Sequence, residues 1–319
     1  MSNFPRRLKR RGRRRRGDGL TCRCSGRPAA RPAAEPERKC NAVTDFSEAY
    51  QKVLPTVVGI GFCDAGSMLV IGTGFIVHPH GWVISNRHVL TELLVAPPDV
   101  NSGVRPDANV FVFVGAPSEG GLSPIQGIIA IGVSELAFHP EAAESIQKNE
   151  LPRIRGLLPT QVLGPIAPDI GVCKFNPAAL PSNTSPIQWT RPSDSSSVRE
   201  GMPIGILGFP LGMTYSLGKM NRVEFQAAPI LQTGVIAARL PLSAAPDFFL
   251  LDVVVNPGSS GSPLFLANGD IVGIVFATRQ RPSPVLGPEQ QTEGVSCVAV
   301  PTSLGYAIPS ARFPKGWVQ

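Results

Sequence analysis

The chain has 319 residues, of which 43% are hydrophobic, 17% charged and 7% aromatic. This is enough hydrophobic chain for one large domain or two small ones with real cores, so disorder throughout is excluded. Gly and Pro number 33 each, which favours many short strands joined by turns over a helix bundle. The sequence contains no unbroken apolar run of about 18 residues, so we expect no membrane span.

Residues 1–41 form a basic tail. Residues 1–40 hold 14 of the 30 Lys and Arg residues and carry a formal charge of +11, whereas the remainder carries −4. The tail lacks apolar periodicity, which predicts a solvated, disordered segment or an upstream start that is not used. Two alternatives are binding to nucleic acid or an anionic membrane surface, and an Arg-rich transit peptide. We see no apolar core of a secretory signal and therefore expect an intracellular, cytoplasmic location.

Six cysteines are too few for a disulfide scaffold in a chain of this length. Three lie singly in the apolar body, and we expect them to be reduced and buried. The other three, Cys22, Cys24 and Cys40, match no standard zinc spacing and have no histidine nearby. A thiolate metal site there is the weaker interpretation, so we expect neither a metal nor a cofactor.

From residue 42 onward the pattern predicts one short helix over residues 45–53, followed by strands. Apolar runs of four to ten residues alternate with turn residues, without long helices between them, which indicates an all-β sandwich or a pair of barrels. Stretches rich in Pro and Ser predict loops at 97–107, 179–196 and 280–290, and 179–196 is the expected linker between two halves. The predicted strands are 57–62, 68–77, 82–85, 110–114, 128–133, 170–175, 204–207, 230–237, 248–255, 271–277 and 295–300.

His88 is the candidate catalytic histidine. Residues 72–89 read as strand, tight turn and strand, with His88 at the far end of the second strand and hence at a rim. A lone histidine there is usually structural. His78 and His80 are turn residues that we interpret as solvated rather than metal-ligating, and His139 has no supporting pattern.

Residues 256–262, here called the serine turn, follow the apolar run 248–255 directly. A serine nucleophile must project from a sharp turn while backbone N–H groups converge on the oxyanion, and Gly258 and Gly261 permit such a turn. Ser260 is then the candidate nucleophile, with the N–H groups of Gly258 and Ser260 as the oxyanion hole. The alternative is an ordinary Gly/Ser loop.

A carboxylate must orient the histidine of a triad. Asp99 and Asp107 lie in a loop pattern, whereas Asp169 opens the apolar run 170–175 and would be held rigidly at a strand entrance. Asp169 is therefore the candidate, with a turn or strand-start residue as the alternative.

Three segments, GTGF at 72–75 with NRHV at 86–89, DIGV at 169–172, and NPGSSGSP at 256–263, together resemble trypsin-like serine proteases, especially the HtrA-like branch. The resemblance implies two six-stranded antiparallel β-barrels of the chymotrypsin type with the site between them. It implies a first barrel over about 53–178 and a second over about 197–310, within a protease domain of residues 42–319. His88 and Asp169 would belong to the first barrel and Ser260 to the second.

The sequence departs from the family pattern in places. Ser259 replaces the aspartate that pairs with a new N-terminus in zymogens, so we expect activity without N-terminal cleavage. Ser262 replaces a glycine and should be tolerated. Only nine residues follow Ser310, so no PDZ domain is expected. The stretch 91–168 is long for the family and is interpreted as a lid or binding insertion.

By the same resemblance, Val254 and Val255 lie at the base of the specificity pocket, and Phe276, Ala277 and Thr278 pair with the substrate backbone. Because no acidic residue stands there, we expect cleavage of polypeptides after small or medium apolar residues. The alternative is that the valines are core residues.

Two functional hypotheses stay open. The first is a serine endopeptidase that forms an acyl-enzyme with His88, Asp169 and Ser260. The second is a protease-fold binding module with a latent site, in which the 91–168 insertion or the tail carries the biological role.

Overall fold

The computed structural model consists mainly of β-strands within the residues that it describes, which are 44–64, 67–97, 99, 102–115, 125–140, 168–182, 187–210, 213–216, 229–241, 246–284 and 297–317. Thr44–Gln319 form one compact unit, distinct from residues 1–43. The predictions for the tail and its three cysteines therefore fall outside the described residues.

Each strand predicted from the sequence overlaps an observed one, and β8 and β11 are additional. The strands are β1 Val57–Cys63, β2 Ser67–His78, β3 Trp82–Ser85, β4 Ala108–Gly115, β5 Ile125–Phe138, β6 Gly171–Phe175, β7 Pro203–Gly208, β8 Met213–Ser216, β9 Ile230–Pro241, β10 Pro246–Asp252, β11 Pro263–Leu266, β12 Ile271–Pro284 and β13 Cys297–Pro309. The helices are α1 Ser47–Val53 and α2 Arg87–Thr91, with 3₁₀ helices η1 Leu54–Thr56, η3 Pro177–Ala179, η4 Ser195–Ser197, η5 Ser310–Arg312 and η6 Lys315–Trp317.

The first six strands form the first barrel. Their order is β1-β4-β5-β6-β3-β2, and the sheet closes because β1 also pairs with β2. Alternation along β1 sends Val58 and Ile60 into the barrel interior, where they pack against Val83 and Val110. Strand β8 adds to the β2 edge of this sheet, although it lies within the range expected for the second barrel.

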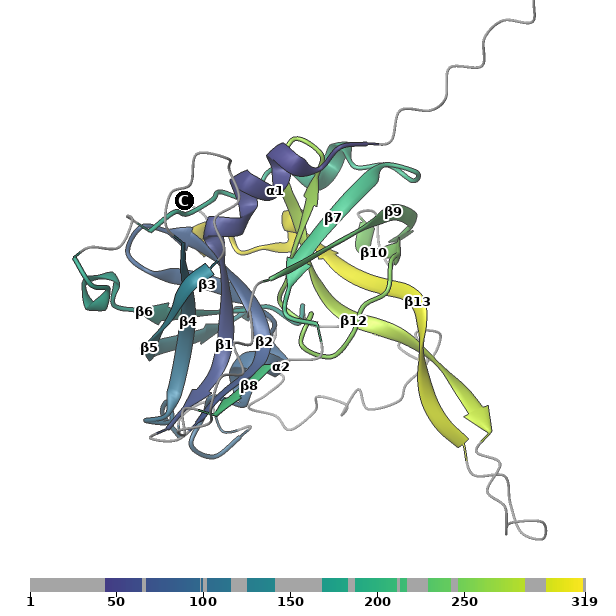
Figure 1. Ribbon diagram of the computed structural model, residues 1–319. Helices are drawn as coiled ribbons and strands as arrows, with labels where there is room; N and C mark the ends of the chain where they lie inside the picture. The colour runs from purple at the N-terminus through teal and green to yellow at the C-terminus, as the bar shows by residue number, and fades with distance from the viewer. Residues whose placement is uncertain are drawn as a thin grey trace, which may run out of the picture. The chain divides into compact units, whose positions relative to one another are not determined.

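The second barrel closes in the order β10-β13-β12-β11-β7-β9. Ile204, Ile206, Phe249 and Leu251 fill its interior. Strands β12 and β13 continue to pair with each other as far as Pro284 and Cys297, so they extend past the barrel as a two-stranded ribbon (Figure 1). The loop expected at 280–290 is therefore wrong for residues 280–284, because strand pairing with β13 overrides the Pro/Ser pattern.

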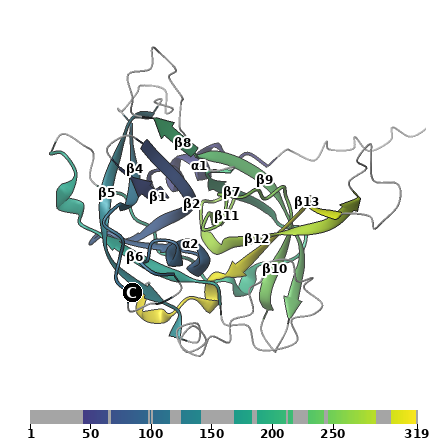
Figure 2. The ribbon, with the colours of Figure 1, turned by 90° about the horizontal axis from the view of Figure 1, so that it is seen from below.

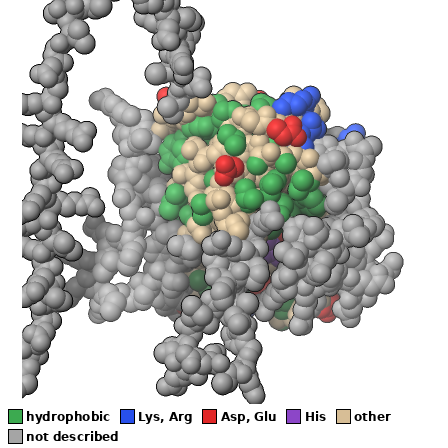
Figure 3. Space-filling model, turned by 90° about the vertical axis from the view of Figure 1, so that its right-hand side faces the viewer, with side chains coloured by type: hydrophobic (Ala, Val, Ile, Leu, Met, Phe, Trp, Pro, Cys, Tyr) green, Lys and Arg blue, Asp and Glu red, His purple; other side chains and the backbone are tan. Residues whose placement is uncertain are grey.

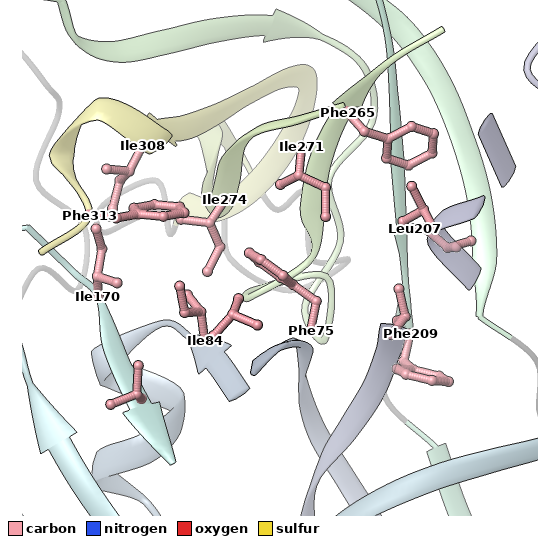
Figure 4. Packing of buried hydrophobic residues seen from close by; sticks show 14 of the residues in the cluster. Phe75, Ile84, Ile170, Leu207, Phe209, Phe265, Ile271, Ile274, Ile308 and Phe313 are labelled. Carbon is pink, nitrogen blue, oxygen red and sulfur yellow. The ribbon is translucent and has the colours of Figure 1, made fainter. Parts of the chain in front are cut away.

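A third apolar cluster joins the two barrels, which lie side by side (Figure 2). Phe75 and Ile84 from the first barrel belong to the same buried cluster as Ile274 from the second and Phe313 near the C-terminus (Figure 4). Helix α1 covers this cluster, and the Phe46 ring just before it meets Phe265 edge-on at 6.0 Å. Burying aromatic and branched side chains from both barrels in one cluster fixes them relative to each other.

The stretch 91–168 was expected to be a lid or binding insertion, and this is wrong for the two strands that its described part contains. Strands β4 and β5 lie inside it and belong to the wall of the first barrel. Residues 141–167 of the same stretch lie outside the described part of the chain. Part of this segment therefore forms strands that close the first barrel.

Figure 3 shows the side of the second barrel, part of which is described. Its described part shows mainly hydrophobic and uncharged polar side chains, with small groups of acidic and basic ones (Figure 3). Among the described residues, no helix has the length and hydropathy needed to cross a membrane.

Candidate active site

His88 lies in helix α2, directly after β3, rather than at the end of a strand as expected. Strand β3 ends at Ser85, and Asn86 has extended φ and ψ of −75° and 144°. The Asn86 carbonyl accepts from the Leu90 N–H at 3.1 Å, so Asn86 occupies the N-cap position of a short helix. The helix buries Val89 and Leu90 and leaves the His88 side chain 47% exposed at the rim.

The pairing of β3 with β6 brings Asp169 to His88. Ser85 lies opposite Gly171 in this antiparallel pair. The residues that follow Ser85, among them His88, therefore lie on the same side as those that precede Gly171, among them Asp169. His88 Nδ1 and Asp169 Oδ2 are 2.5 Å apart, and the His88 backbone N–H donates to Asp169 Oδ1 at 3.0 Å. The Asn86 side-chain amide also donates to the Asp169 carbonyl at 2.9 Å. The carboxylate is thus held in one orientation against the ring.

The two side chains stabilise each other's charged form. Burial by itself favours the neutral imidazole, but the Asp169 carboxylate outweighs it and raises the pKa of His88 above 6.5. Burial likewise favours a protonated Asp169, yet His88 and then Arg87 lower the pKa of that carboxyl below its ordinary value. His88 therefore releases its ring proton at a higher pH than an ordinary histidine does.

Arg87 is a second cation beside the same carboxylate. Its Nε lies 3.7 Å from Asp169 Oδ1, and its side chain is only 10% exposed. Its Nη1 is buried and has no hydrogen-bond partner within the described parts of the chain. The positive charge of Arg87 favours an ionised Asp169 and opposes protonation of His88.

The serine turn consists of two successive tight turns. The Ser259 N–H donates to the Asn256 carbonyl at 3.0 Å, with Pro257 and then Gly258 at φ +89° between them, as in a type II turn. The Ser262 N–H then donates to the Ser259 carbonyl at 3.0 Å, and Gly261 again has φ +89°. Both glycines thus adopt the left-handed conformation that the predicted turn requires.

The serine turn is bonded to the first barrel through Thr73 of β2. The Thr73 N–H donates to the Ser260 carbonyl at 2.8 Å, and its hydroxyl donates to the Gly258 carbonyl at 2.9 Å. The Ser85 hydroxyl in turn donates to the Thr73 carbonyl at 2.6 Å. Because Ser85 ends the strand that leads into α2, Ser260 and His88 are anchored at the same junction.

The His88 ring and Ser260 Oγ form no hydrogen bond in the described part of the chain. Such bonds are often long in enzymes without substrate and shorten when the substrate binds. The N–H groups of Gly258 and Ser260 have no backbone acceptor among the described residues.

The residues expected to bind substrate lie in different environments. Val254 is exposed, whereas Val255 is buried in the core cluster of the second barrel. Phe276, Ala277 and Thr278 are partly buried on β12, where the pairing with β13 shifts register. The alternative that the two valines are core residues is therefore confirmed for Val255 and wrong for Val254.

The other histidines have different surroundings, although the His139 backbone N–H donates to the carbonyl of Ile170, the neighbour of Asp169, at 3.1 Å. The rings of His78 and His80 meet at 4.7 Å in the β2–β3 turn, and the buried His139 lies 6.4 Å from the Trp317 ring. No group of three or more side chains suited to hold a metal ion occurs in the described ranges. Sequence reasoning missed the roles of Thr73 and Arg87; a hydroxyl between two glycines in an apolar strand was the available signal for Thr73.

Comparisons with known proteins identify the family. A family model described as a trypsin-like peptidase domain matches residues 72–274. A probable periplasmic serine endoprotease DegP-like from Halomonas elongata is 29% identical over 109 residues, covering 33% of this chain and 19% of that protein. A putative serine protease HhoA from Synechocystis sp. is 28% identical over 143 residues, 44% of this chain and 28% of that protein. This chain thus spans less than a third of these curated relatives.

Among solved structures, the HtrA-type protease AlgW with a decapeptide is similar, with 16% identity and a TM-score of 0.44. The match covers 84% of this chain and 64% of that one.

The expected intracellular, cytoplasmic location is wrong, because the DegP-like relatives are named periplasmic. The expectation that the cysteines of the apolar body are buried holds for Cys173, whereas Cys63 is only partly buried. Cys63 in β1 and Cys173 in β6 are free, and burial raises the pKa of the Cys173 thiol to about 12, which keeps it inert in any compartment.

The family match covers more than half of the chain, and it includes His88, Asp169 and Ser260. The resemblance found in the sequence is therefore confirmed, and the chain belongs to the trypsin-like peptidase family.

Proposed function

We propose that this chain is a serine endopeptidase that cleaves polypeptides through an acyl-enzyme intermediate. The observation that carries the proposal is the contact of His88 Nδ1 with Asp169 Oδ2, at the junction to which the serine turn is bonded. An imidazole held by a buried carboxylate beside a serine on a sharp turn is the arrangement that activates a hydroxyl for acyl transfer.

In the proposed reaction, Ser260 Oγ attacks the carbonyl carbon of the scissile peptide bond while His88 Nε2 takes its proton. Asp169 keeps the proton on Nδ1 and stabilises the imidazolium that forms. His88 then gives the proton to the leaving amine as the C–N bond breaks. A water molecule, deprotonated by His88, hydrolyses the ester and regenerates Ser260.

The N–H groups of Gly258 and Ser260 are the proposed donors to the tetrahedral oxyanion. Both are free of backbone acceptors within the described chain, so neither has to give up a bond when charge develops. Loss of one such donor typically lowers turnover by about 10²–10³.

The proposed substrates are polypeptides cut after small or medium apolar residues. Val254 is exposed six residues before Ser260. Phe276–Thr278 lie on β12, directly after Val275, whose carbonyl accepts from the Gly261 N–H of the serine turn, and an extended peptide could pair with their backbone. The names of the DegP-like relatives, which are periplasmic serine endoproteases, agree with a peptide substrate. They also favour a place of action outside the cytoplasm.

The proposal is tested by intact-mass detection of a fluorophosphonate adduct on purified protein. We expect one adduct on the wild type and on Ser303→Ala, whose serine is exposed on β13, and none on Ser260→Ala. Peptide hydrolysis should fall by about 10⁴–10⁶ in Ser260→Ala. A folded wild type without an adduct, or an adduct that survives in Ser260→Ala, would contradict the proposal.

A further inference from the structure

Thr73 is a fully buried polar residue, 0% exposed, in a strand whose neighbours are glycines and apolar side chains. Its hydroxyl donates to the Gly258 carbonyl at 2.9 Å and accepts from the Phe209 N–H at 3.1 Å. Its backbone donates to the Ser260 carbonyl at 2.8 Å and accepts from the Ser85 hydroxyl at 2.6 Å. One residue therefore links three separate segments of the chain.

The Thr73 hydroxyl has little freedom to move. A β-branched side chain has few allowed rotamers, and the space beside it is filled. A Cβ added to Gly208 would lie 2.8 Å from Thr73 Oγ1 and would overlap Ser262 Oγ. The hydroxyl is thus held by packing as well as by its two hydrogen bonds.

Thr73 fixes the peptide groups on both sides of the Ser260 N–H. The Gly258 carbonyl belongs to the peptide group that precedes the Ser259–Ser260 peptide, and the Ser260 carbonyl belongs to the one that follows it. Both carbonyls are bonded to Thr73, one to its hydroxyl and one to its backbone. Because each peptide group is planar, anchoring these two restricts the rotation that would turn the Ser260 N–H away.

We propose that Thr73 is a positioning residue for the reaction, whose hydroxyl holds the serine turn in the conformation in which the oxyanion donors converge. This inference rests on the proposed function. Without the hydroxyl, the Gly258 carbonyl and the Phe209 N–H lose a buried partner, and the turn shifts to find others. The consequence is a defect in turnover, because donors must already be oriented when charge develops.

The test compares Thr73→Val, which replaces the hydroxyl with a methyl group, with Thr73→Ser, which keeps it. Thr56→Val is the matched control, because Thr56 is also buried and its hydroxyl donates to the Val53 carbonyl at 2.7 Å. Neither partner of that bond belongs to the site. All variants are measured for Tm, for kcat and KM on a peptide substrate, and for the rate of fluorophosphonate labelling.

For Thr73→Val we expect kcat and the labelling rate to fall by about 10²-fold, with KM changed less than about threefold. Thr56→Val should lower Tm by a similar amount without the kinetic defect, and Thr73→Ser should recover most of the lost rate. A Thr73→Val protein that loses Tm like Thr56→Val but keeps kcat within about threefold of the wild type would overturn the proposal.

If Thr73→Val does not fold, Thr73→Ala and Thr73→Ser form a second pair that differs only in the hydroxyl. A kcat at least about tenfold higher in the serine variant supports the inference, and equal values overturn it. The wild type separates this result from the proposed function. If the wild type is unreactive toward fluorophosphonate, the proposed function fails; if it reacts and the Thr73 variants react equally fast, only the inference fails.

Discussion

The two sides of the candidate site are built by different means. On the first barrel, His88 and Asp169 are joined by side-chain contacts, and their charges shift each other's pKa. On the second barrel, the serine turn is shaped by backbone hydrogen bonds and by two glycines at φ +89°. Electrostatics dominates one side and backbone geometry the other.

The contrast means that the two sides should fail in different ways. A change of charge at constant size on the first barrel should disturb the chemistry while the fold persists, because the backbone contacts remain. An added carbon in the serine turn should disturb the fold first, since the turn has no spare space. Three variants test this contrast, each beside a matched control.

The largest expected effect is that of Asp169→Asn, which removes the charge and keeps the shape. We expect kcat to fall by about 10⁴-fold, because His88 is then held in the wrong tautomer and its imidazolium is not stabilised. The control is Asp107→Asn, which breaks the ion pair with Arg105 on a loop of the same barrel and should leave kcat unchanged. Steady-state kinetics measures both, and a loss of less than tenfold in Asp169→Asn would contradict the assigned role.

Gly261→Ala should have the second largest effect, and it should lower both the stability of the fold and the rate of the reaction. At φ +89° an alanine is strained, and its Cβ would overlap the Thr73 carbonyl and lie 2.5 Å from Ser85 Oγ. We expect a loss of about 3 kcal/mol or more in the free energy of unfolding.

Gly201→Ala is the control for Gly261→Ala, because Gly201 has φ +81° but no atoms within 4 Å of a Cβ. Gly201→Ala should lower the free energy of unfolding by about 1 kcal/mol, because only the backbone conformation is unfavourable there. Denaturant unfolding compares the two. Equal losses would show that the close approach to Thr73 and Ser85 contributes nothing.

The smallest expected effect is that of Arg87→Gln on the pH dependence of kcat/KM. In the proposed mechanism His88 acts as a base only when it is neutral, so kcat/KM should rise with pH through a pKa above 6.5. The charged groups acting on His88 are Asp169 and Glu92, which raise its pKa, and Arg87, which lowers it. Arg87→Gln should therefore move the acid limb of the profile to higher pH.

Lys174→Gln serves as the control for Arg87→Gln, because Lys174 pairs with Glu135 on the first barrel. This substitution should leave the acid limb of the pH profile unchanged. The measurement is the pH profile of kcat/KM. If the acid limb of the Arg87→Gln profile lies at the same pH as that of the wild type, or at a lower pH, then the charge of Arg87 does not lower the pKa of His88.

Stability and activity should respond to pH in opposite directions. The raised pKa of His88 contributes stability that is complete below its ordinary value of 6.5 and is lost as pH rises through the folded-state pKa. The lowered pKa of Asp169 contributes stability that is complete above 3.8 and is lost as pH falls through its folded-state pKa. The ion pair thus stabilises the fold most between about pH 4 and 6.5, below the range in which the base is active.

The strand positions were largely predictable, because most of the apolar runs were bounded by Gly, Pro or Asn. β11 was missed because its four residues lie beside the serine turn, and β8 because its residues carry no strong apolar pattern. The ends of β12 and β13 were also missed. Their pairing beyond the barrel depends on a partner far along the chain rather than on local preference.

In the candidate site, His88, Asp169 and Ser260 could be proposed from the sequence, whereas Thr73 and Arg87 could not. His88, Asp169 and Ser260 are marked by their chemistry and by the strands or turns beside them. Arg87 and the Thr73 hydroxyl make their contacts with residues 82 or more positions away. In the sequence, Thr73 is marked only by its place between two glycines in an apolar strand, and no local pattern marks Arg87.

By itself, the sequence determined the all-β class, the location of most strands, the two sharp glycine turns and the candidate reactive side chains, because these depend on local periodicity and backbone conformation. Only the tertiary structure decided that His88 stands on a helix, that Val255 is core while Val254 is exposed, and that Thr73 ties the serine turn to the first barrel. These outcomes depend on how two barrels pack against one buried cluster, and such packing joins residues that no local pattern relates.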